Sequence, residues 1–496
     1  MAFKDLNEFI RLLEAEGELV RIREEVSPHL EITEITDRVS KKNGPALLFE
    51  NVGSPSGDPV LINAFGSLKR IKMALQVKEL DDLAADIMVF MEMEGVGGIL
   101  DKLRLLPKIK RLSSIFPRVV KNAPCQEVIL KEKEVDLETL PVLYCWPKDA
   151  GPFITMPLVA TCHPQTGKRN LGMYRLQIFD KNTTGMHWHP HKGGAQHYRI
   201  AGETGVNLPA SVAIGPDPAC TYAATAPLPD DTDEYLLAGY LRKKPVELVK
   251  SVTNDIMVPA SAQYILEGFV KPGERRREGP FGDHTGYYSP ADDYPVFHVT
   301  CLTRRKNPIY QTTVVGRPPM EDAFLGKATE RLFLPIIKKQ LSEVVDMNLP
   351  IEGVFHNMAF ISIDKHYPGH AKKVMHALWG LGQMMFSKMI FVFDREVNVQ
   401  DISEALWYMG NNVAPLRDIS FVEGPLDVLD HASERPLYGS KMGVDCTRKW
   451  PEEGFDREWP EVIEMDQSVK DRIVSIWSRL GIEKHLGEYS KNTSND

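Results

Sequence analysis

The chain has 496 residues, of which 43% are hydrophobic and 26% charged, a balance typical of a globular protein with a sizeable core. Its length suggests about three domains. The 59 Lys and Arg against 68 Asp and Glu leave a net charge of −9, which argues against a dedicated nucleic-acid-binding protein and favours a small-molecule partner.

Residues 1–120 predict an N-terminal α/β module with a linker. A helix is expected to begin after Asp5, a suitable N-cap, and to end near Gly17. Its apolar stripe is Leu6, Phe9, Ile10 and Leu13. The elements expected next are a strand at 19–22, a helix at 30–39, strands at 46–49 and 60–62, and two helices within 67–93. Basic residues interleaved with Leu and Ile between 102 and 121 predict an amphipathic connector with a solvated face, and a partner-facing surface is the alternative.

The central part of the chain has a different sequence pattern. Residues 121–325 are β-rich, with Pro and Gly between short apolar runs, and predict a barrel-like central domain. The strands expected there are 127–130, 156–161, 171–179, 211–214 and 296–303.

Residues 326–496 predict a second α/β module. It is expected to contain a helix at 331–344, a strand at 359–363, a helix at 371–381 and a buried strand at 389–393. A last apolar stripe predicts a terminal helix that packs in the core or against another subunit. The stripe consists of Val469, Ile473, Ile476, Trp477 and Leu480.

The cysteines and the N-terminus indicate where such a protein would work. Six cysteines, at 125, 145, 162, 220, 301 and 446, include no Cys-x-x-Cys pair, which disfavours a zinc ribbon or a disulfide scaffold and predicts a reducing cytoplasm. The N-terminus lacks the features of a signal peptide, and no apolar run approaches the roughly 18 residues of a membrane span. Peripheral membrane contact remains compatible with this pattern.

Four of the fourteen histidines lie within His187–His197, a density that indicates a polar site. On a strand His187, His189 and His191 would share one face, as metal ligands do, but a proline and two glycines favour a loop. The Lys-Gly-Gly stretch at 192–194 suits a phosphate, because glycine lets backbone N–H groups approach an anion while lysine neutralises it. A phosphate or cofactor loop, metal ligation and ordinary loop histidines all remain open.

Two acids flank a Gly- and Pro-containing turn in the segment EGPFGDHTGYY, residues 278–288. If Glu278 and Asp283 share a cavity, the pKa of one of them rises, and a protonated carboxyl group becomes available as a general acid. The alternative is an acidic surface turn beside the arginines at 275–277.

Arg175 alternates with apolar neighbours, so it is expected to point into the domain or a cleft, where it needs an anionic partner. A substrate carboxylate and a structural salt bridge are both suitable. Asn170 would face the opposite side of a regular strand, so both residues line one site only if Gly172 allows a bulge or a close backbone approach.

Together these segments resemble the UbiD family of decarboxylases, nearly end to end. The resemblance rests on Asn170–Arg175, His187–Gly194, Glu278–Tyr288, Gly316–Pro319 and Gly439–Gly443. It implies a non-oxidative, reversible decarboxylase that uses prenylated FMN and a divalent metal, expected to be Mn²⁺, with K⁺. It also implies a flavin-reductase-like split β-barrel at 121–325, between the modules at 1–120 and 326–496.

The resemblance places a catalytic triad on Arg175, Glu278 and Asp283. Loss of CO2 from an aromatic ring leaves an electron pair on an sp² carbon, so the cofactor must act as the electron sink. Arg175 would orient the substrate carboxylate, Glu278 would hold that arginine, and Asp283 would return a proton.

The implied metal ligands are Asn170, Glu234 and His197, with His191 as the rival of His197. The metal would bridge the protein and the cofactor phosphate. The implied flavin contacts are Met173, Tyr174, Arg175, His187, Trp188, His189, Lys192 and Gly193.

The substrate resemblance is strongest to the enzyme of ubiquinone biosynthesis that acts on 4-hydroxy-3-polyprenylbenzoate. The histidine-rich stretch at 187–191 departs from that enzyme's pattern, so another aromatic, heteroaromatic or polycyclic acid remains the alternative. The family also implies a flavin prenyltransferase as cofactor supplier and a homo-oligomer, dimer or hexamer, formed through the C-terminal module. A flavin oxidoreductase is a remote alternative, because no Gly-x-Gly-x-x-Gly follows a strand.

Overall fold

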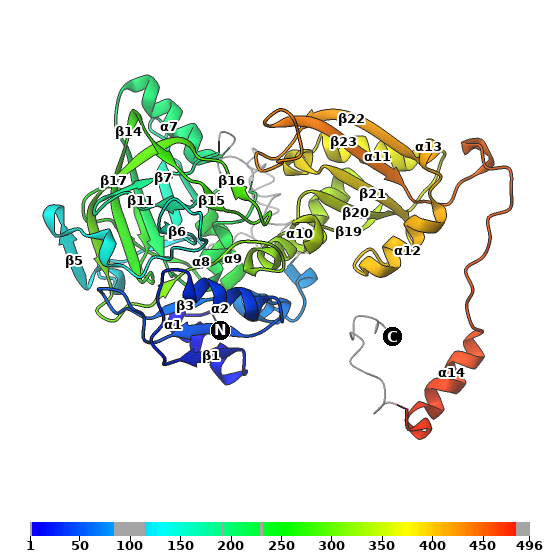
Figure 1. Ribbon diagram of the computed structural model, residues 1–496, viewed down its shortest axis with the longest axis horizontal. Helices are drawn as coiled ribbons and strands as arrows, with labels where there is room; N and C mark the ends of the chain where they lie inside the picture. Colours follow the sequence, from blue (N-terminus) through cyan, green and yellow to red (C-terminus); the bar gives the residue numbers. More distant parts are fainter. Residues whose placement is uncertain (1, 84–114, 190–191, 229–231, 483–496) are drawn as a thin grey trace, which may run out of the picture. The chain divides into compact units, whose positions relative to one another are not determined.

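The computed structural model describes residues 2–83, 115–189, 192–228 and 232–482, and the chain divides into two compact units (Figure 1). Unit 1 comprises Met1–Gln340 with the short segments Leu349–Asn357 and Val428–Ala432. Unit 2 comprises Leu341–Asn348, Met358–Asp427 and Ser433–Asp496. The predicted site residues all belong to unit 1.

The N-terminal elements follow the sequence prediction. Helix α1 (Leu6–Ala15) begins where the Asp5 side chain accepts a hydrogen bond from the backbone N–H of Glu8 at 3.1 Å, and its apolar stripe is buried. Strands β1 (Leu19–Ile22), β2 (Ala46–Phe49) and β3 (Val60–Ile62) occupy the expected residues and form a four-stranded sheet with β18 (Tyr310–Gln311). Helices α2 (Glu31–Ser40) and α3 (Leu68–Leu75) accompany them. The rest of the second predicted helix and the basic stretch as far as residue 114 lie outside the described residues.

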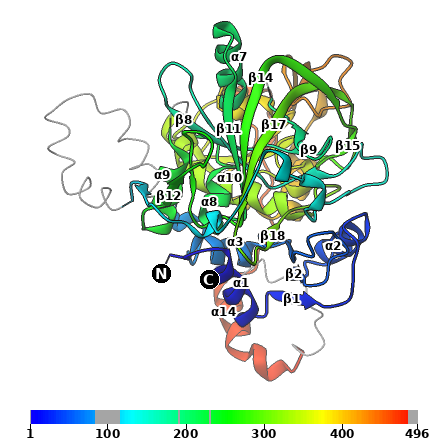
Figure 2. The ribbon, with the colours of Figure 1, turned by 90° about the vertical axis from the view of Figure 1, so that its left-hand side faces the viewer.

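The largest sheet of unit 1 is seven-stranded and antiparallel (Figure 2). Its strand order is β10 (Thr183–Gly185), β17 (Asp292–Arg304), β14 (Tyr264–Glu278), β11 (Leu208–Ile214), β7 (Leu158–Cys162) and β8 (Arg169–Met173), with β5 (Val128–Lys131) paired to β17. No pairing within the described chain joins β8 to β10, so this sheet is not a closed barrel.

The predicted strand at 171–179 is wrong, because the chain changes sheets within it. β8 ends at Met173, and β9 (Leu176–Gln177) pairs instead with β6 (Phe153–Ile154). Arg175 therefore lies between two strands, and the alternation of a regular strand does not apply to it. The absence of a side chain at Gly172 instead lets the Tyr174 ring approach the backbone. A Cβ on residue 172 would lie 2.4 Å from the Tyr174 hydroxyl oxygen.

The helices of unit 1 include one that differs from its predicted bounds. α10 (Glu321–Gln340) begins ten residues before the predicted helix at 331–344, and Val344 begins strand β19 instead.

The other elements are α7 (Gly193–Thr204), α8 (Pro218–Ala223), α9 (Glu234–Arg242), the sheet of β4 (Arg118–Val119), β12 (Glu247–Lys250) and β13 (Met257–Pro259), and the hairpin of β15 (Phe281–Gly282) and β16 (Tyr288–Ser289).

Unit 2 is a mixed sheet with helices, as an α/β module predicts. The strand order is β19 (Val344–Asn348), β20 (Met358–Ile363), β21 (Met389–Asp394), β23 (Tyr438–Asp445) and β22 (Ile419–Pro425), and the three central strands are parallel. Its helices are α11 (His370–Trp379), α12 (Ile402–Asn412), α13 (Pro415–Asp418) and the terminal α14 (Gln467–Ile476). The predicted terminal helix exists, but it has no buried residue, so it does not pack in the core.

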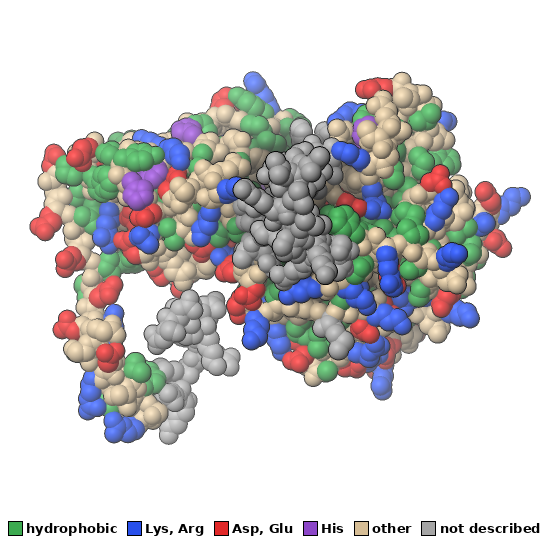
Figure 3. Space-filling view, turned by 180° about the vertical axis from the view of Figure 1, so that it is seen from behind, with side chains coloured by type: hydrophobic (Ala, Val, Ile, Leu, Met, Phe, Trp, Pro, Cys, Tyr) green, Lys and Arg blue, Asp and Glu red, His purple; other side chains and the backbone are tan. Residues whose placement is uncertain are grey.

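The surface carries charges of both signs. Figure 3 shows basic and acidic side chains intermingled on the face that it presents, in keeping with the modest net charge of the sequence. No helix of the described chain is long and apolar enough to cross a membrane.

Candidate active site

Arg175 lies between the two predicted acids. Its Nε donates to Glu278 Oε1 at 3.1 Å, and its Nη1 donates to Asp283 Oδ2 at 2.5 Å. The third nitrogen, Nη2, donates to Ser289 Oγ at 3.2 Å, and the guanidinium carbon stands 4.5 Å from the centre of the Phe281 ring. Arg175 is therefore in direct contact with both other members of the predicted triad, and the acidic-surface-turn alternative for Glu278 and Asp283 is wrong.

The three charged groups are almost removed from solvent. The side chain of Arg175 is 10% exposed, that of Asp283 7%, and that of Glu278 is fully buried. Glu278 Oε2 has no hydrogen-bond partner among the described residues. Buried ion pairs of this kind are expensive to desolvate, so an unpaired buried carboxylate oxygen indicates a group kept for binding or chemistry.

The local sequence explains why the acids meet. Glu278 ends β14, and Asp283 follows β15, after the turn that the sequence predicted. Two side chains from elsewhere hold this turn: Gln177 Oε1 accepts the N–H of Gly279 at 2.8 Å, and Asp149 Oδ1 accepts that of Gly282 at 2.7 Å. The positions of both catalytic candidates thus depend on residues far away in the chain.

The pKa of Asp283 is held well below its usual range. Burial alone would raise it, but the hydrogen bond from His284 and the positive charge of Arg175 outweigh burial. Asp283 Oδ1 accepts both the backbone N–H of His284 at 2.8 Å and its Nδ1–H at 2.9 Å. With Arg175 in this position, Asp283 is an ionised carboxylate.

His187 joins the same cluster. Its Nδ1 donates to Glu278 Oε1 at 2.7 Å, and its ring stacks on Tyr294 with centroids 4.1 Å apart. Burial lowers the pKa of His187, and the hydrogen bond to Glu278 only partly opposes this. The His189 ring lies edge-on, 5.0 Å away from that of His187.

The predicted metal ligands Asn170 and Glu234 also meet. Asn170 Nδ2 donates to Glu234 Oε1 at 3.4 Å, and Glu234 Oε2 accepts the N–H of Leu171 at 2.9 Å. Burial raises the pKa of Glu234 to about 8. Asn170 Oδ1 is buried and has no partner in the part of the chain that the structure describes. An amide oxygen and a carboxylate are oxygen donors of the kind that hard divalent cations prefer, so this pair fits a metal.

His197 lies next to this pair. Its Nδ1 is 2.9 Å from Thr161 Oγ1, and Thr161 is the direct cross-strand partner of Asn170. The rival His191 lies outside the described residues. Within the described ranges no three His, Cys, Asp or Glu side chains form a metal cluster.

The start of helix α7 provides a seat for an anion. Lys192 is the N-cap residue and makes no side-chain cap hydrogen bond, so the first N–H groups of a 12-residue helix stand beside a lysine. A Cβ on Gly193 would lie 1.9 Å from Asn170 Oδ1, and one on Gly194 would lie 2.6 Å from Trp188 Nε1. The buried Trp188 Nε1–H is a donor without a described partner. These groups would suit a phosphate-bearing cofactor, and the nearby Asn170 oxygen would suit a divalent cation.

The remaining predicted cofactor residues belong to the same strands and loop. Met173 ends β8, while Tyr174 is buried and Arg175 follows directly. His187, Trp188 and His189 form the loop between β10 and the start of α7. Residues 187–189 form no strand, so a strand that presents histidine ligands on one face is not supported, and the cofactor-loop interpretation stays a prediction.

Several site residues were missed by sequence reasoning. Ser289, Phe281 and Tyr294 contact Arg175 or His187, and Asp149 and Gln177 hold the turn. Ser289 and Tyr294 follow the EGPFGDHTGYY turn, and pairing the strands on either side of it would have placed Ser289 opposite Phe281 and Tyr294 opposite Arg276, two residues before Glu278. Asp149 and Gln177 carried no signal, because their partners are backbone groups more than a hundred residues away.

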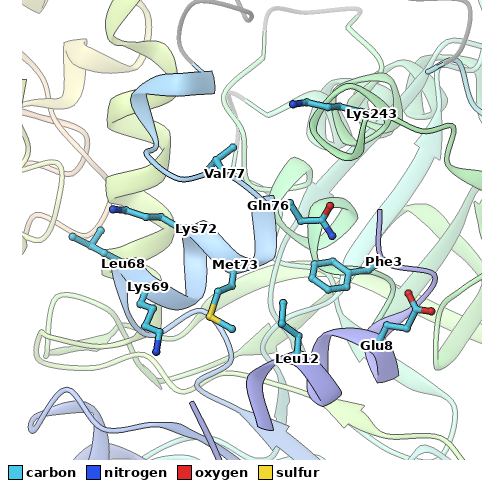
Figure 4. A pocket seen from close by; sticks show the side chains of 10 residues that line it. All are labelled: Phe3, Glu8, Leu12, Leu68, Lys69, Lys72, Met73, Gln76, Val77 and Lys243. Atoms are coloured by element: carbon cyan, nitrogen blue, oxygen red, sulfur yellow. The ribbon is translucent and has the colours of Figure 1, made fainter. Parts of the chain in front are cut away.

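A pocket of about 860 Å³ lies elsewhere on unit 1 (Figure 4). It is lined mainly by side chains of α1 and α3, among them Leu12, Lys72 and Met73. It contains none of the predicted site residues.

Three family models match the chain in order. The N-terminal domain of 3-octaprenyl-4-hydroxybenzoate carboxy-lyase matches residues 10–87, its Rift-related domain 118–318 and its C-terminal domain 323–446. An uncharacterised protein of Aquifex aeolicus is 53% identical over 97% of this chain and 99% of its own length, and one of Archaeoglobus fulgidus is 49% identical over the same shares. The chain belongs to the UbiD family and is a carboxy-lyase of the UbiD type.

Solved structures agree with this assignment. The vanillic acid decarboxylase of Sedimentibacter hydroxybenzoicus in its closed form is 28% identical, with a TM-score of 0.83, over 97% of this chain and 99% of that one. The UbiD-class enzyme HmfF of Pelotomaculum thermopropionicum, in complex with FMN, is 29% identical with a TM-score of 0.77, over 94% and 99%. An evolved dimeric form of HmfF, in complex with prenylated FMN, is 29% identical with a TM-score of 0.76, over 94% and 100%.

Proposed function

We propose that this protein is a reversible, non-oxidative decarboxylase of an aromatic carboxylic acid that uses prenylated FMN. The observation that carries the proposal is Arg175 held between the buried carboxylates Glu278 and Asp283. A guanidinium in such a position can exchange one carboxylate partner for another, and the carboxylate of a substrate is the natural replacement. The similarity to a vanillic acid decarboxylase supports an aromatic acid as substrate.

The chain's own residues divide the work. Arg175 binds and orients the substrate carboxylate, and Glu278 with His187 fixes the guanidinium through Nε. When Arg175 turns to the substrate, Asp283 loses a positive neighbour, and its pKa rises towards the range of a proton donor. Asp283 then takes up a proton from solvent and gives it to the ring carbon that has lost CO2. Prenylated FMN, when bound, supplies the electron sink for this carbon.

The cofactor and metal would be held by the start of α7 and the adjoining strand. Lys192 and the N–H groups of Gly193 and Gly194 would take the phosphate, and Asn170 with Glu234 and His197 would hold a divalent cation, for which we propose Mn²⁺. The other contacts proposed are Met173, Tyr174, His187, Trp188 and His189, with K⁺ as a further ion. This assignment includes a split-barrel central domain at 121–325 between modules at 1–120 and 326–496.

Among substrates, 4-hydroxy-3-polyprenylbenzoate of quinone biosynthesis is the first candidate, and other aromatic, heteroaromatic or polycyclic acids are the alternatives. We further propose that a flavin prenyltransferase supplies the cofactor, that the enzyme works in the cytoplasm, and that it is a homo-oligomer, dimer or hexamer.

The test is to coexpress the chain with a flavin prenyltransferase and to record the absorbance and mass of the bound cofactor. The protein is then incubated anaerobically with 4-hydroxybenzoate, vanillic acid, 3,4-dihydroxybenzoic acid and a prenylated 4-hydroxybenzoate while CO2 is measured. We expect bound prenylated FMN and CO2 release from at least one acid. Arg175→Ala should abolish release, and Arg276→Ala, an exposed arginine on β14, is the matched control.

Two results would contradict the proposal. Unmodified flavin with hydride transfer to an acceptor would indicate an oxidoreductase that uses the same fold. No bound flavin and no CO2 from any acid would indicate a protein without catalytic activity.

A further inference from the structure

A second segment of the chain fixes the turn that carries Asp283. Asp149 Oδ1 accepts the N–H of Gly282, the residue before Asp283, at 2.7 Å. Next to it, the N–H of Ala150 donates to the carbonyl oxygen of Pro280 at 2.9 Å. These two hydrogen bonds join segments that lie 133 positions apart in the sequence. The place of the Asp283 carboxyl group therefore depends on where Asp149 lies.

Asp149 is itself held by its own segment. Its Oδ2 accepts the backbone N–H of Trp146 at 2.9 Å, and its carbonyl oxygen accepts a hydrogen bond from the Tyr144 hydroxyl. The Trp146 ring lies against the turn, since a Cβ on Gly282 would be 2.2 Å from its Cδ1, and its Nε1–H donates to the Val315 carbonyl oxygen at 2.9 Å. The carboxyl group thus connects two backbone N–H groups, one in each segment, and both of them are donors.

Burial makes the charge of Asp149 depend on pH. The residue is 3% exposed, and burial raises the pKa of its carboxyl group to about 6, although the two N–H groups and the positive charge of Arg175 oppose this rise. Asp149 is therefore a carboxylate at neutral pH and takes up a proton as the pH falls through about 6. The charged and titratable groups of the elements packed around it are Arg175, Asp283, Cys145, Tyr144 and Tyr288.

We propose that Asp149 is a positioning residue for the acid Asp283 and that it performs this role only as a carboxylate. A carboxylate accepts from the N–H groups of both segments at once, because it has an acceptor oxygen for each. A protonated carboxyl group carries a hydrogen on one oxygen, which then faces an N–H donor, so that hydrogen bond is lost. The turn is held less firmly as a result, and Asp283 leaves the geometry that proton transfer to the ring carbon needs.

This role rests on the proposed decarboxylase function, and its kinetics differ from those of a purely structural role. A loss of stability alone would reduce the amount of folded enzyme and leave the kcat of the folded fraction and its pH profile unchanged. A positioning role lowers kcat, because it affects the proton transfer. It leaves KM near the parent value, because Glu278 still holds Arg175 for the substrate carboxylate.

The first test measures kcat and KM of the holoenzyme between pH 5 and 8 on whichever acid of the panel releases CO2. We expect the kcat of the parent to decrease as the pH falls through about 6. The Asp149→Asn amide presents an acceptor to one N–H and a donor to the other. This variant should have a kcat about 10- to 100-fold lower at pH 7.5, a KM within about twofold of the parent's, and no decrease in kcat near pH 6. Asp322→Asn, which changes another carboxyl group whose pKa burial raises to about 6, is the matched control and should keep the decrease.

The second test needs no activity. Hydrogen–deuterium exchange at pH 7.5, followed by mass spectrometry of peptides that span residues 279–289, should be faster in Asp149→Asn than in the parent. The exposed Glu138→Gln should leave this exchange unchanged. If Asp149→Asn does not fold, crystal structures of the parent at pH 5 and 7.5 replace the comparison. One of the two N–H contacts of the Asp149 carboxyl group should then lengthen beyond about 3.5 Å at pH 5.

Several results would overturn the role of Asp149 alone. They are a parent kcat that does not decrease near pH 6, Asp149→Asn with the parent kcat at pH 7.5, a decrease near pH 6 that Asp149→Asn keeps or Asp322→Asn loses, unchanged exchange in the turn, and the same N–H contacts at both pH values. No CO2 from the parent would overturn the proposed function instead. The exchange and crystal measurements would still decide whether the Asp149 carboxylate holds the turn.

Discussion

Asp283 combines two properties that are difficult to hold at once. Its contacts with His284 and Arg175 keep the pKa of the Asp283 carboxyl group low when no substrate is bound, yet the proposed chemistry needs this group protonated. Because Arg175 also contacts Glu278, a shift of the guanidinium towards a substrate breaks one ion pair and keeps the other. Substrate binding would then both orient the carboxylate and prepare the acid.

The Asp283→Asn variant tests this role. An amide can still hydrogen-bond to Arg175 or His284 but cannot donate a proton to carbon. We expect normal flavin binding and a kcat lower by about 10²- to 10⁴-fold, measured as CO2 release from the panel acid. Asp255→Asn, a change at an exposed ion pair, should keep the parent rate. Parent-like turnover by Asp283→Asn would show that the proton comes from elsewhere.

Gly193 gives a second test at the same scale. A Cβ there would displace the Asn170 amide, a flexible side chain, so Gly193→Ala should fold while moving a proposed metal-binding oxygen. We expect metal affinity to fall by about 10- to 100-fold, measured by metal analysis and by flavin absorbance. Gly202→Ala in the same helix meets nothing within 4 Å and should bind metal normally. Equal metal content in both variants would remove Asn170 from the site.

At the scale of the element, local signals predicted what local physics determines. The N-cap at Asp5 and the stripe of α1 identified that helix, and short apolar runs located β1, β2 and β3 to the residue. The sequence could not predict that the chain changes sheets between β8 and β9. The apolar alternation continues across the break, and the partner strands determine where one strand ends and the next begins. The triad was predicted from motif residues, whereas its supports, Asp149 and Gln177, act on distant backbone groups.

Helix α10 shows how tertiary contacts extend an element beyond its apolar pattern. It begins at the buried Glu321, whose Oε1 accepts the N–H of Phe65 at 2.7 Å. Its Oε2 has no partner in the described ranges, and burial raises the pKa of Glu321 to about 7. The carboxyl group is therefore more easily protonated in the folded protein than in the unfolded chain.

The pH dependence of stability follows from this raised pKa. The folded state holds an extra proton between about pH 4.5 and 7, so the stabilisation is complete below pH 4.5 and is lost as the pH rises through about 7. Glu321→Gln removes this titrating group. As the pH rises from 5 to 8, the free energy of unfolding of the variant should therefore increase relative to that of the parent by on the order of 3 kcal/mol, and its thermal midpoint should increase relative to the parent's accordingly. The exposed Glu138→Gln is the control. A midpoint difference that does not change with pH would contradict the assignment.

At the scale of the whole molecule, the terminal helix lacks a partner within the described chain. The apolar stripe of α14 and the turn after it keeps Val469, Ile473, Trp477 and Leu480 between 37% and 46% exposed. A helix of ten residues is marginal in water unless an apolar face is covered. Of the two roles that the sequence predicted for this stripe, core packing is wrong, and contact with another subunit stays a prediction.

Charges placed on the stripe test that role. Ile473→Asp with Trp477→Asp should lower the molar mass measured by light scattering, because burying two carboxylates in a subunit interface is costly. Ser475→Asp, on the opposite face of α14, should keep the parent mass and is the matched control. If the double variant keeps the parent mass while the flavin content is normal, subunit contact does not depend on this helix, and the edge strand β22 with its exposed Phe421 becomes the surface to change next.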